Sequence, residues 1–193
     1  MSKNILVILG QPQRHSYGGA LMQAYSEGAR AAGAEVKELY LGDLKFDPLA
    51  ITSLAHLNEL EPDLTLAQEA IKWADHLVFV YPIWWGTIPA LLKGFIERVF
   101  LPGFAVNFRK NSPLWDKLLT GRSARLIVTL NTPSWIYRWY FGRPGHNTMK
   151  KTILQFCGID PVRITEVGPL KNSTEEKRQQ WIAQIRALGT RQA

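Results

Sequence analysis

Two short runs of apolar residues constrain the fold more than any other feature of this sequence. Residues 4–10 read Asn-Ile-Leu-Val-Ile-Leu-Gly, and residues 76–82 read His-Leu-Val-Phe-Val-Tyr-Pro. Neither run alternates between apolar and polar positions, as a strand with one solvated face does. Continuous apolar runs of this length are typical of parallel strands that are covered on both faces. The chain is therefore expected to form an α/β structure around a parallel sheet.

The spacing of apolar residues predicts three more strands and five helices. The strands are expected at 35–41, 123–130 and 161–167, and the helices at 16–33, 64–74, 88–101, 148–158 and 174–188. Residues 42–63, which include Pro48 and Pro62, are expected to form a loop. Strands that alternate with helices join through right-handed crossovers into a sheet covered on both sides. We therefore expect one α/β domain over residues 1–193, and the pattern alone leaves two strand orders open.

The basic charge of the chain belongs to its second half. The formal net charge is +7. Residues 1–104 hold 8 Lys and Arg against 11 Asp and Glu, a net −3, whereas residues 105–193 hold 15 against 5, a net +10. The basic residues are scattered rather than gathered in one run, which favours solvated surfaces over a nucleic-acid interface. A second interpretation is a positive field that attracts anionic nucleotides.

The sequence favours a cytoplasmic protein without a metal site. No apolar run approaches the roughly 20 residues of a membrane-spanning helix, and the first three residues lead directly into a predicted strand. Cys157 is the single cysteine, so it cannot form an internal disulfide, and we interpret it as a buried helix residue. The dispersed histidines show no metal-ligand spacing: His15, His56 and His76.

The loop after the first strand ends at a possible phosphate-binding helix start. It runs from Gly10 to Gly19 and reads Gly-Gln-Pro-Gln-Arg-His-Ser-Tyr-Gly-Gly. This matches neither the Gly-x-x-x-x-Gly-Lys-Ser/Thr of ATP-binding loops nor the Gly-x-Gly-x-x-Gly of dinucleotide-binding folds. Ser16 nevertheless stands at a helix N-terminus, where free N–H groups and the helix dipole favour an anion. Taken alone, Ser16 is better explained as a simple N-cap.

The loop after the 76–82 strand contains two adjacent tryptophans, Trp84 and Trp85. Adjacent side chains point in different directions, so two rings at this position are difficult to place in a core. Large rings at the edge of a sheet offer a flat surface for a planar ligand. A flavin is the planar ligand that fits best, and backbone N–H groups of the loop can bond its polar edge.

Two segments together resemble the flavodoxin-like NAD(P)H:quinone oxidoreductase family, which includes DT-diaphorase and many small bacterial reductases. They are residues 16–21, Ser-Tyr-Gly-Gly-Ala-Leu, and residues 82–100, which begin Pro-Ile-Trp-Trp-Gly-Thr-Ile-Pro. The resemblance covers most of the chain, and residues 82–100 are its most specific part. It implies strand order 2-1-3-4-5, bound FAD or FMN, and NAD(P)H as the electron donor. It also implies ping-pong hydride transfer to quinones and a homodimer with active sites at the subunit interface.

The resemblance also implies roles for individual residues. The flavin-binding candidates lie in the two loops: Gln11, Ser16, Tyr17, Gly18, Pro82, Ile83, Trp84 and Trp85. Those of the first loop correspond to the phosphate end of the flavin, and those of the second to the isoalloxazine. Trp85 is in addition a catalytic candidate. Phe104, within the family-like segment 103–106, and Phe108 are candidate contacts for the nicotinamide or quinone.

The loop after the 123–130 strand departs from the family pattern. The family has a Thr-Thr-Gly-Gly type of turn there, whereas this chain has Asn131, Thr132 and Pro133. Proline removes a backbone donor and fixes its own φ, so the flavin contacts there cannot be identical. Asn131 and Thr132 are still assigned to the cofactor, as polar groups in the corresponding place.

The residues that follow this loop are unusually aromatic. Residues 135–141 read Trp-Ile-Tyr-Arg-Trp-Tyr-Phe and can form a lid, a dimer seam, a membrane-surface contact or core. Core and seam are favoured over a membrane role, and Trp135 and Tyr137 are included as substrate-contact candidates. His146, further along, is a catalytic candidate for proton relay during hydride transfer. The alternative, an ordinary capping or loop histidine, has nearly equal weight.

Three functional hypotheses emerge from the sequence. The leading one is a flavin-dependent NAD(P)H dehydrogenase of the quinone type, with quinones, nitro compounds or azo dyes as acceptors. The second is a flavin- or nicotinamide-binding accessory subunit that regulates a transporter or another partner. The third is a one-electron carrier of the flavodoxin type. Such carriers are usually acidic, so the charge of +7 argues against the third hypothesis.

Overall fold

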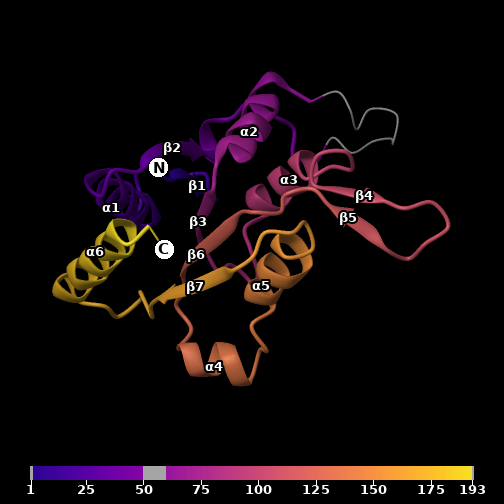
Figure 1. The fold of residues 1–193 in the computed structure, drawn as a ribbon. Coiled ribbons are helices and arrows are strands. Elements are labelled where there is room, and N and C mark those ends of the chain that lie inside the picture. Colours follow the sequence, from indigo (N-terminus) through magenta and orange to yellow (C-terminus); the bar gives the residue numbers. More distant parts are fainter. Residues whose placement is uncertain (1, 50–59, 193) are drawn as a thin grey trace.

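A five-stranded parallel sheet forms the centre of the computed structural model, which describes residues 2–49 and 60–192. The sheet order is β2-β1-β3-β6-β7, with parallel register at every pair. Counted along the chain, this is the order 2-1-3-4-5, so the predicted α/β fold and the implied strand order are confirmed (Figure 1). His56 lies outside the described residues. The strands are β1 (Asn4–Leu9), β2 (Glu35–Tyr40), β3 (His76–Pro82), β6 (Ser123–Thr129) and β7 (Val162–Val167).

Helices α1 (Tyr17–Ala31) and α6 (Glu175–Thr190) cover one face of the sheet. Each helix begins at a hydroxyl N-cap, Ser16 for α1 and Thr174 for α6. Such caps satisfy N–H groups that the first helical turn leaves without partners. The strand residues that point to this face are fully buried against the helices: Ile5, Val7, Leu9, Val78, Val80 and Ile127.

Helices α2 (Pro62–Trp73) and α3 (Ala90–Val99) cover the opposite face. The short helix α5 (Pro144–Asn147) and the π-helical segment η3 (Thr148–Leu154) complete this layer. The central strands β1 and β3 are apolar at nearly every position because both of their faces are buried in this way, whereas the edge strands β2 and β7 are partly exposed and carry charged residues. The strand residues on this second face are Leu6, Ile8, Leu77, Phe79, Leu126 and Val128.

The backbones of α1 and α6 touch where the two helices lie side by side (Figure 1). A Cβ atom at Gly28 of α1 would overlap the carbonyl oxygen of Arg186 in α6. A Cβ at Gly189 would overlap the carbonyl oxygen of Tyr25 in the same way. Only glycine permits such a close approach, so these two positions set the packing of the layer.

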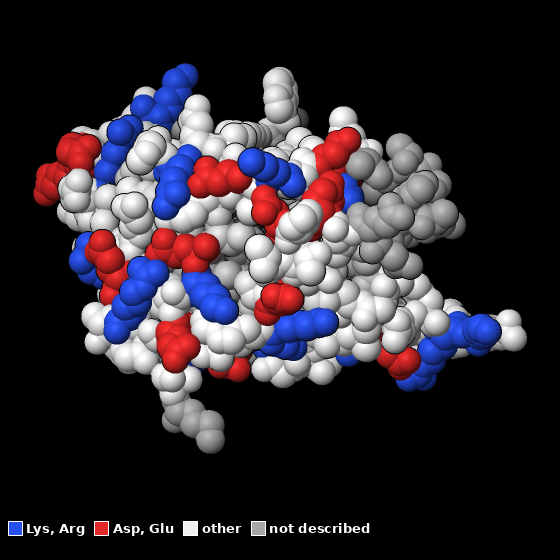
Figure 2. Space-filling view, turned by 90° about the horizontal axis from the view of Figure 1, so that it is seen from above, with Lys and Arg blue, Asp and Glu red and all other residues white. Residues whose placement is uncertain are grey.

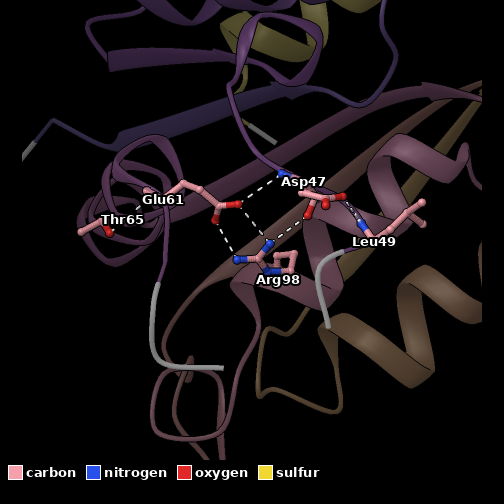
Figure 3. Close-up of polar contacts among 5 residues, drawn as sticks. All are labelled: Asp47, Leu49, Glu61, Thr65 and Arg98. Atoms are coloured by element: carbon pink, nitrogen blue, oxygen red, sulfur yellow. Dashed lines mark hydrogen bonds and ion pairs between the residues drawn. The ribbon is translucent and has the colours of Figure 1, made fainter. Parts of the chain in front are cut away.

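An ion pair fastens the chain on both sides of residues 50–59 to helix α3. The Arg98 guanidinium donates to both carboxylate oxygens of Glu61, at 2.7 and 3.1 Å, and to the Asp47 carbonyl at 2.8 Å (Figure 3). The Asp47 N–H in turn donates to Glu61 at 3.1 Å. Arg98 is buried, and its two hydrogen bonds to the Glu61 carboxylate offset the cost of removing its charge from water.

Several elements between the strands of the sheet were not predicted, among them the short helices η1 (Leu41–Asp43) and α5. Strands β4 (Val106–Phe108) and β5 (Trp115–Lys117) form an antiparallel hairpin, and residues 134–139 form helix α4 (Ser134–Trp139). Figure 1 shows the hairpin projecting to the right and α4 standing below the sheet. The predicted helix at 148–158 is wrong in detail, because the chain is π-helical to Leu154 and then forms turns. Cys157 is therefore buried, but in a turn and not in a helix.

The surface seen in Figure 2 carries both signs of charge, with Lys and Arg interspersed among Asp and Glu. The projection on the right, which corresponds to the β4–β5 hairpin, carries basic residues near its tip. This distribution agrees with the interpretation of the charges on this face as solvated surface. Within residues 2–49 and 60–192, no helix is long and apolar enough to cross a membrane.

Candidate active site

A cavity of about 230 Å³ lies at the carboxyl ends of β1, β3 and β6. Four segments form it: the loop before α1 with its first turn, the end of β3 with the following loop, the end of β6, and Leu170 in the segment after β7. In a sheet of this order, ligands bind at this edge, beside the point where the strand order reverses. The cavity is lined by Gln11, Gln13, Ser16, Tyr17, Gly18, Pro82, Ile83, Trp84, Thr129, Leu130, Asn131 and Leu170.

Ser16 organises the α1 side of this cavity. Its Oγ accepts hydrogen bonds from Gln11 Nε2 at 2.6 Å and from the Gly19 N–H at 3.1 Å, and it donates to the Gln13 carbonyl at 2.9 Å. The cap leaves the N–H groups of Tyr17 and Gly18 without a partner inside the helix. These two N–H groups and the positive end of the helix dipole give this part of the cavity a preference for an anion.

Gly19 keeps the loop close to the helix start. A Cβ at this position would overlap the carbonyl oxygen of Arg14, and the nearest other atoms include Ser16 Oγ. Arg14 is itself held from outside by an ion pair with Asp43 at 3.2 Å and by stacking on the Tyr40 ring. The loop can therefore wrap this tightly only because residue 19 has no side chain.

The two tryptophans belong to a tight two-residue turn. Trp84 and Thr87 exchange backbone hydrogen bonds at 3.0 Å, while Trp85 and Gly86 have φ of 50° and 78°. Positive φ at both central residues is the signature of a type I′ turn, which favours Asn and Gly. Trp85 is therefore in an unfavourable backbone conformation, and its ring is fully exposed.

A second cavity of about 480 Å³ adjoins the first on the other side of Ile83, Leu130 and Asn131, which line both. The second cavity is lined by Ile83, Trp85, Gly86, Leu130, Asn131, Thr132, Tyr137, Phe141 and Pro144.

Pro133, the residue at which this chain departs from the family pattern, is the N-cap of α4. A proline at this position costs the helix no hydrogen bond, because an N-cap N–H has no partner inside the helix.

Tyr137 joins the tryptophan turn to α5. Its hydroxyl donates to the Gly86 carbonyl at 3.0 Å and accepts from the Gly145 N–H at 3.0 Å. The side chain is almost completely buried, and burial raises the pKa of the phenol. Tyr137 therefore remains protonated and acts as a clamp between the turn and the helix.

His146 lies behind Tyr137, with 2% of its surface exposed. Its ring contacts the Tyr137 ring edge-on at 5.1 Å, and Nε2 lies 2.9 Å from Glu166, which also pairs with Arg143 at 3.3 Å. Burial lowers the pKa of His146, although the bond to Glu166 opposes this shift. The imidazole is therefore neutral near pH 7 and donates Nε2–H to Glu166. Nδ1 has no partner in the described part of the chain.

The structure brings together most, but not all, of the predicted site residues. The eight candidates of the first two loops, with Asn131, Thr132 and Tyr137, line one or both cavities. Phe104 does not: it is 7% exposed and packs in the core against Phe100. Phe108 and Trp135 are exposed on the hairpin and on α4, and His146 is one layer behind the cavities.

The predicted site did not include several residues that line the cavities, or Glu166 behind them: Gln13, Gly86, Thr129, Leu130, Phe141, Pro144 and Leu170. Thr129 could have been found, because it is the last residue of a predicted strand at the expected edge. Gly86 could also have been found, because it follows the two tryptophans and glycine accepts the positive φ that a tight turn requires. Leu170 and Glu166 enter only through the packing of β7 and the segment after it, which no local pattern encodes.

The sheet order and the cavity between a helix start and two strand ends define the class of flavodoxin-like proteins. Residues 3–188 match the family described as having a flavodoxin-like fold, and the chain belongs to this family. The resemblance to the flavodoxin-like NAD(P)H:quinone oxidoreductases is thereby confirmed, since curated relatives carry that name.

Two curated relatives illustrate this. The chain is 31% identical over 151 residues to "Ribosyldihydronicotinamide dehydrogenase-like protein traD" of Penicillium crustosum, covering 65% of this chain and 57% of that protein. It is 26% identical over 194 residues to "NAD(P)H dehydrogenase [quinone] 1" of Rattus norvegicus, covering 86% of this chain and 70% of that protein. The chain thus spans little more than half the length of the first relative. The expectation of an enzyme of this type agrees with both names.

Solved structures share the whole architecture. Smu.1420 from Streptococcus mutans UA159 matches with a TM-score of 0.86 and 30% identity over 97% of this chain and 99% of that one. An FMN-dependent NADH-azoreductase from Bacillus anthracis, solved in complex with FMN, matches with a TM-score of 0.79 and 18% identity over the full length of both chains. At that identity the second match shows the fold alone.

Proposed function

We propose that this protein is a flavin-dependent NAD(P)H oxidoreductase that passes two electrons as hydride to quinones or similar small acceptors. The observation that carries the proposal is the pair of adjoining cavities, one beginning at a helix N-terminus and the other lined by aromatic rings. The names of the relatives, NAD(P)H dehydrogenase [quinone] and ribosyldihydronicotinamide dehydrogenase, support the same activity.

The donor set of the first cavity fits the phosphate end of a flavin nucleotide. The N–H groups of Tyr17 and Gly18, next to the capping hydroxyl of Ser16, are suited to bind phosphate oxygens. FMN and FAD share this phosphate and the isoalloxazine, so the same residues serve either cofactor. The FMN bound to the azoreductase of the same fold is consistent with this.

The edge between the two cavities fits a planar ring system. Pro82, Ile83 and Trp84 provide one border, and Asn131 and Thr132 provide polar groups on the other. A bound flavin supplies the ability to accept hydride from NAD(P)H and to donate it to a quinone. The larger cavity beside Trp85 and Tyr137 gives room for nicotinamide and quinone in turn, as a ping-pong cycle requires.

The chain's own residues mainly orient reactants and exclude water. Tyr137 holds the tryptophan turn against α5, so the backbone at Gly86 is fixed where the second cavity opens. A proton relay from His146 has to operate through Tyr137, because His146 borders neither cavity. In this proposal His146 and Glu166 position Tyr137, and water or the acceptor's surroundings supply the proton that completes the quinol.

We further propose a cytoplasmic homodimer in which the second subunit completes the site. A third hollow of about 480 Å³, mostly apolar, lies beyond the tryptophan turn and includes Trp84, Ile88 and Pro89. Several rings near it and on α4 are exposed, a concentration that usually marks an interface: Trp85, Trp135, Trp139, Tyr140 and Phe141. The same rings support the alternative, a flavin-binding accessory subunit that docks on a membrane transporter or another partner.

Purified protein distinguishes these functions. The proposal expects a yellow protein whose flavin is released by denaturation and identified by mass, and which oxidises NAD(P)H in the presence of a quinone. Light scattering on the same sample gives the oligomeric state. Bound flavin without NAD(P)H-dependent turnover would support the accessory function, and protein that neither retains nor binds added FMN or FAD would refute both.

Ser16→Ala provides a sharper test of the phosphate end. We expect this variant to lose about 1 kcal/mol of stability through the missing cap and to bind flavin at least about tenfold more weakly. Thr174→Ala is the matched control, because Thr174 caps α6 with the same chemistry but away from the cavities. Flavin affinity is measured by fluorescence titration. Equal affinity in Ser16→Ala and Thr174→Ala would show that Ser16 acts only as an N-cap.

A further inference from the structure

A separate cavity of about 340 Å³ lies at the amino ends of the strands, opposite the candidate active site. It forms where the end of α6 meets the starts of β1, β3, β6 and β7. Lys3, Arg163 and Arg191 give it three cationic side chains. The remaining lining residues are His76, Ser123, Ala124, Pro161 and Gln192.

His76 is the most unusual member of this cavity. It is 3% exposed and lies beside Ser123 in the parallel register of β3 and β6. Nδ1 is 2.7 Å from Ser123 Oγ, whereas Nε2 has no hydrogen-bond partner among residues 2–49 and 60–192. A buried ring nitrogen without a partner is costly, so it calls for a ligand or a water molecule.

The charges around His76 identify the sign of such a ligand. Burial, together with the nearby charges of Lys3, Arg125 and Arg163, lowers the pKa of His76 to about 3. Burial also lowers the pKa of Lys3; Asp75 opposes this shift and Arg163 adds to it. Asp75 faces Lys3 from the start of β3, and the Lys3 ammonium donates to the Gln192 carbonyl at 2.7 Å. Positive charge is thus in excess here, and an anion relieves the repulsion.

We propose that this cavity binds an oxyanion of the phosphate class, held by Arg163 and Arg191 at the mouth and by His76 on the floor, where the Ser123 hydroxyl donates to Nδ1 of His76. Guanidinium groups match phosphate oxygens in geometry, and a neutral imidazole can donate Nε2–H to an acceptor oxygen. The cavity is larger than one phosphate ion, so a phosphate carried by a small organic molecule fits as well. The flavin site does not account for it, because the two cavities lie at opposite ends of the strands.

The test is a titration of the full chain with inorganic phosphate at pH 7, followed by nuclear magnetic resonance of the histidine ring nitrogens. His76→Asn assigns the His76 signal. We expect a saturable shift of that signal, with half-saturation raised about tenfold by Arg163→Gln and by Arg191→Gln. Arg186→Gln is the matched control, because it removes the same charge from an exposed ion pair with Glu27 on α1.

Each outcome decides the proposal. Chloride at equal ionic strength must leave the His76 signal in place, and a shift of the same size in chloride would overturn specific binding. So would a His76 signal that does not respond to phosphate, or equal weakening by all three arginine variants. A parallel titration with glycerol 1-phosphate separates the two sources of the ligand: tighter binding than that of free phosphate assigns the site to a phosphorylated small molecule. The exposed arginine variants keep the test valid if His76→Asn does not fold.

Discussion

The cavities at the two edges of the sheet are formed by different kinds of groups. At the carboxyl edge, the cavities are lined by uncharged side chains and depend on tight backbone features: the cap and first turn of α1, a type I′ turn at Trp85, and Gly19, which has no room for a side chain. At the amino edge, the cavity is shaped by charged side chains around a buried imidazole. We therefore expect the carboxyl edge to be disrupted by substitutions that add atoms to the backbone turns, and the stability of the amino edge to depend on pH.

The reason lies in the direction of the strands. Helix starts follow the carboxyl ends of parallel strands, so N–H groups gather there and bind anions without charged side chains. The amino ends receive helix ends instead, whose carbonyl groups repel anions. A site for an anion at the amino edge therefore needs arginine and lysine, which is the composition found there.

The largest expected effect comes from adding one methyl group to α1. Gly19→Ala and Gly28→Ala each place a Cβ into a carbonyl oxygen, of Arg14 and of Arg186 respectively. We expect each to lower the free energy of unfolding by about 3 kcal/mol, because backbone must move. Only Gly19→Ala should also abolish flavin binding.

Urea unfolding and flavin titration of both variants make this comparison. Flavin affinity that falls equally in Gly28→Ala would mean that α1 packing as a whole, and not the loop at the carboxyl edge, controls the site. Full stability of Gly19→Ala would show that the loop has room to adjust.

The next effect belongs to the amino edge and depends on pH. His76 has an ordinary pKa near 6.5 when unfolded and about 3 when folded, so the unfolded chain binds more protons between these values. The contribution of neutral His76 to the free energy of unfolding is therefore present above pH 6.5 and is lost as the pH decreases towards 3. Between pH 6.5 and 4.5 we expect the wild type to lose about 2 kcal/mol more than His76→Asn.

The control for this prediction is His15→Asn, because His15 is exposed in the loop before α1. Its pH profile should follow that of the wild type in phosphate-free buffer. Parallel profiles for wild type and His76→Asn would show that His76 contributes no such dependence.

The fold could be read from the sequence wherever burial imposed a pattern. Runs such as 5–9 and 77–81 are apolar because helices cover both of their faces, and these runs predicted the parallel sheet. The β4–β5 hairpin was not predicted because its strands have three residues each and are largely exposed, so they show no apolar pattern. The helix at 134–139 was not predicted because Trp135 and Trp139 are exposed and only Tyr137 is buried, which leaves no apolar stripe.

The site was predictable as far as it is local in sequence. Ser16, Trp84 and their neighbours lie next to strand ends, where topology brings them together. Tyr137 was assigned to substrate contact, but its clamp on Gly86 depends on the packing of α4 and α5. Phe104 was assigned to the site because it lies in the family-like segment 103–106, yet it packs in the core against Phe100.

A smaller effect should follow from loss of one hydroxyl at the carboxyl edge. Tyr137→Phe removes hydrogen bonds to Gly86 and Gly145, and we expect a loss of about 1.5 kcal/mol with slower quinone reduction. Tyr81→Phe is the matched control, because the buried Tyr81 hydroxyl has no partner in the part of the chain described. Its removal should be neutral or stabilising in urea unfolding. An equal loss of stability in both variants would show that the Tyr137 hydroxyl does not hold the turn against α5.

The smallest stability effect, with a distinct functional one, is expected at Trp85. Asn accepts positive φ more readily than Trp, and the exposed ring contributes no burial in the single chain. Trp85→Asn should therefore raise the stability of flavin-free protein by about 0.5 kcal/mol while weakening flavin retention or slowing its reduction by NAD(P)H. Trp139→Ala, which removes another exposed ring that borders neither cavity, should leave flavin retention unchanged. If Trp85→Asn gains stability and keeps wild-type flavin content and reduction rate, the strained turn serves an interface with another chain, and the carboxyl edge binds flavin without this ring.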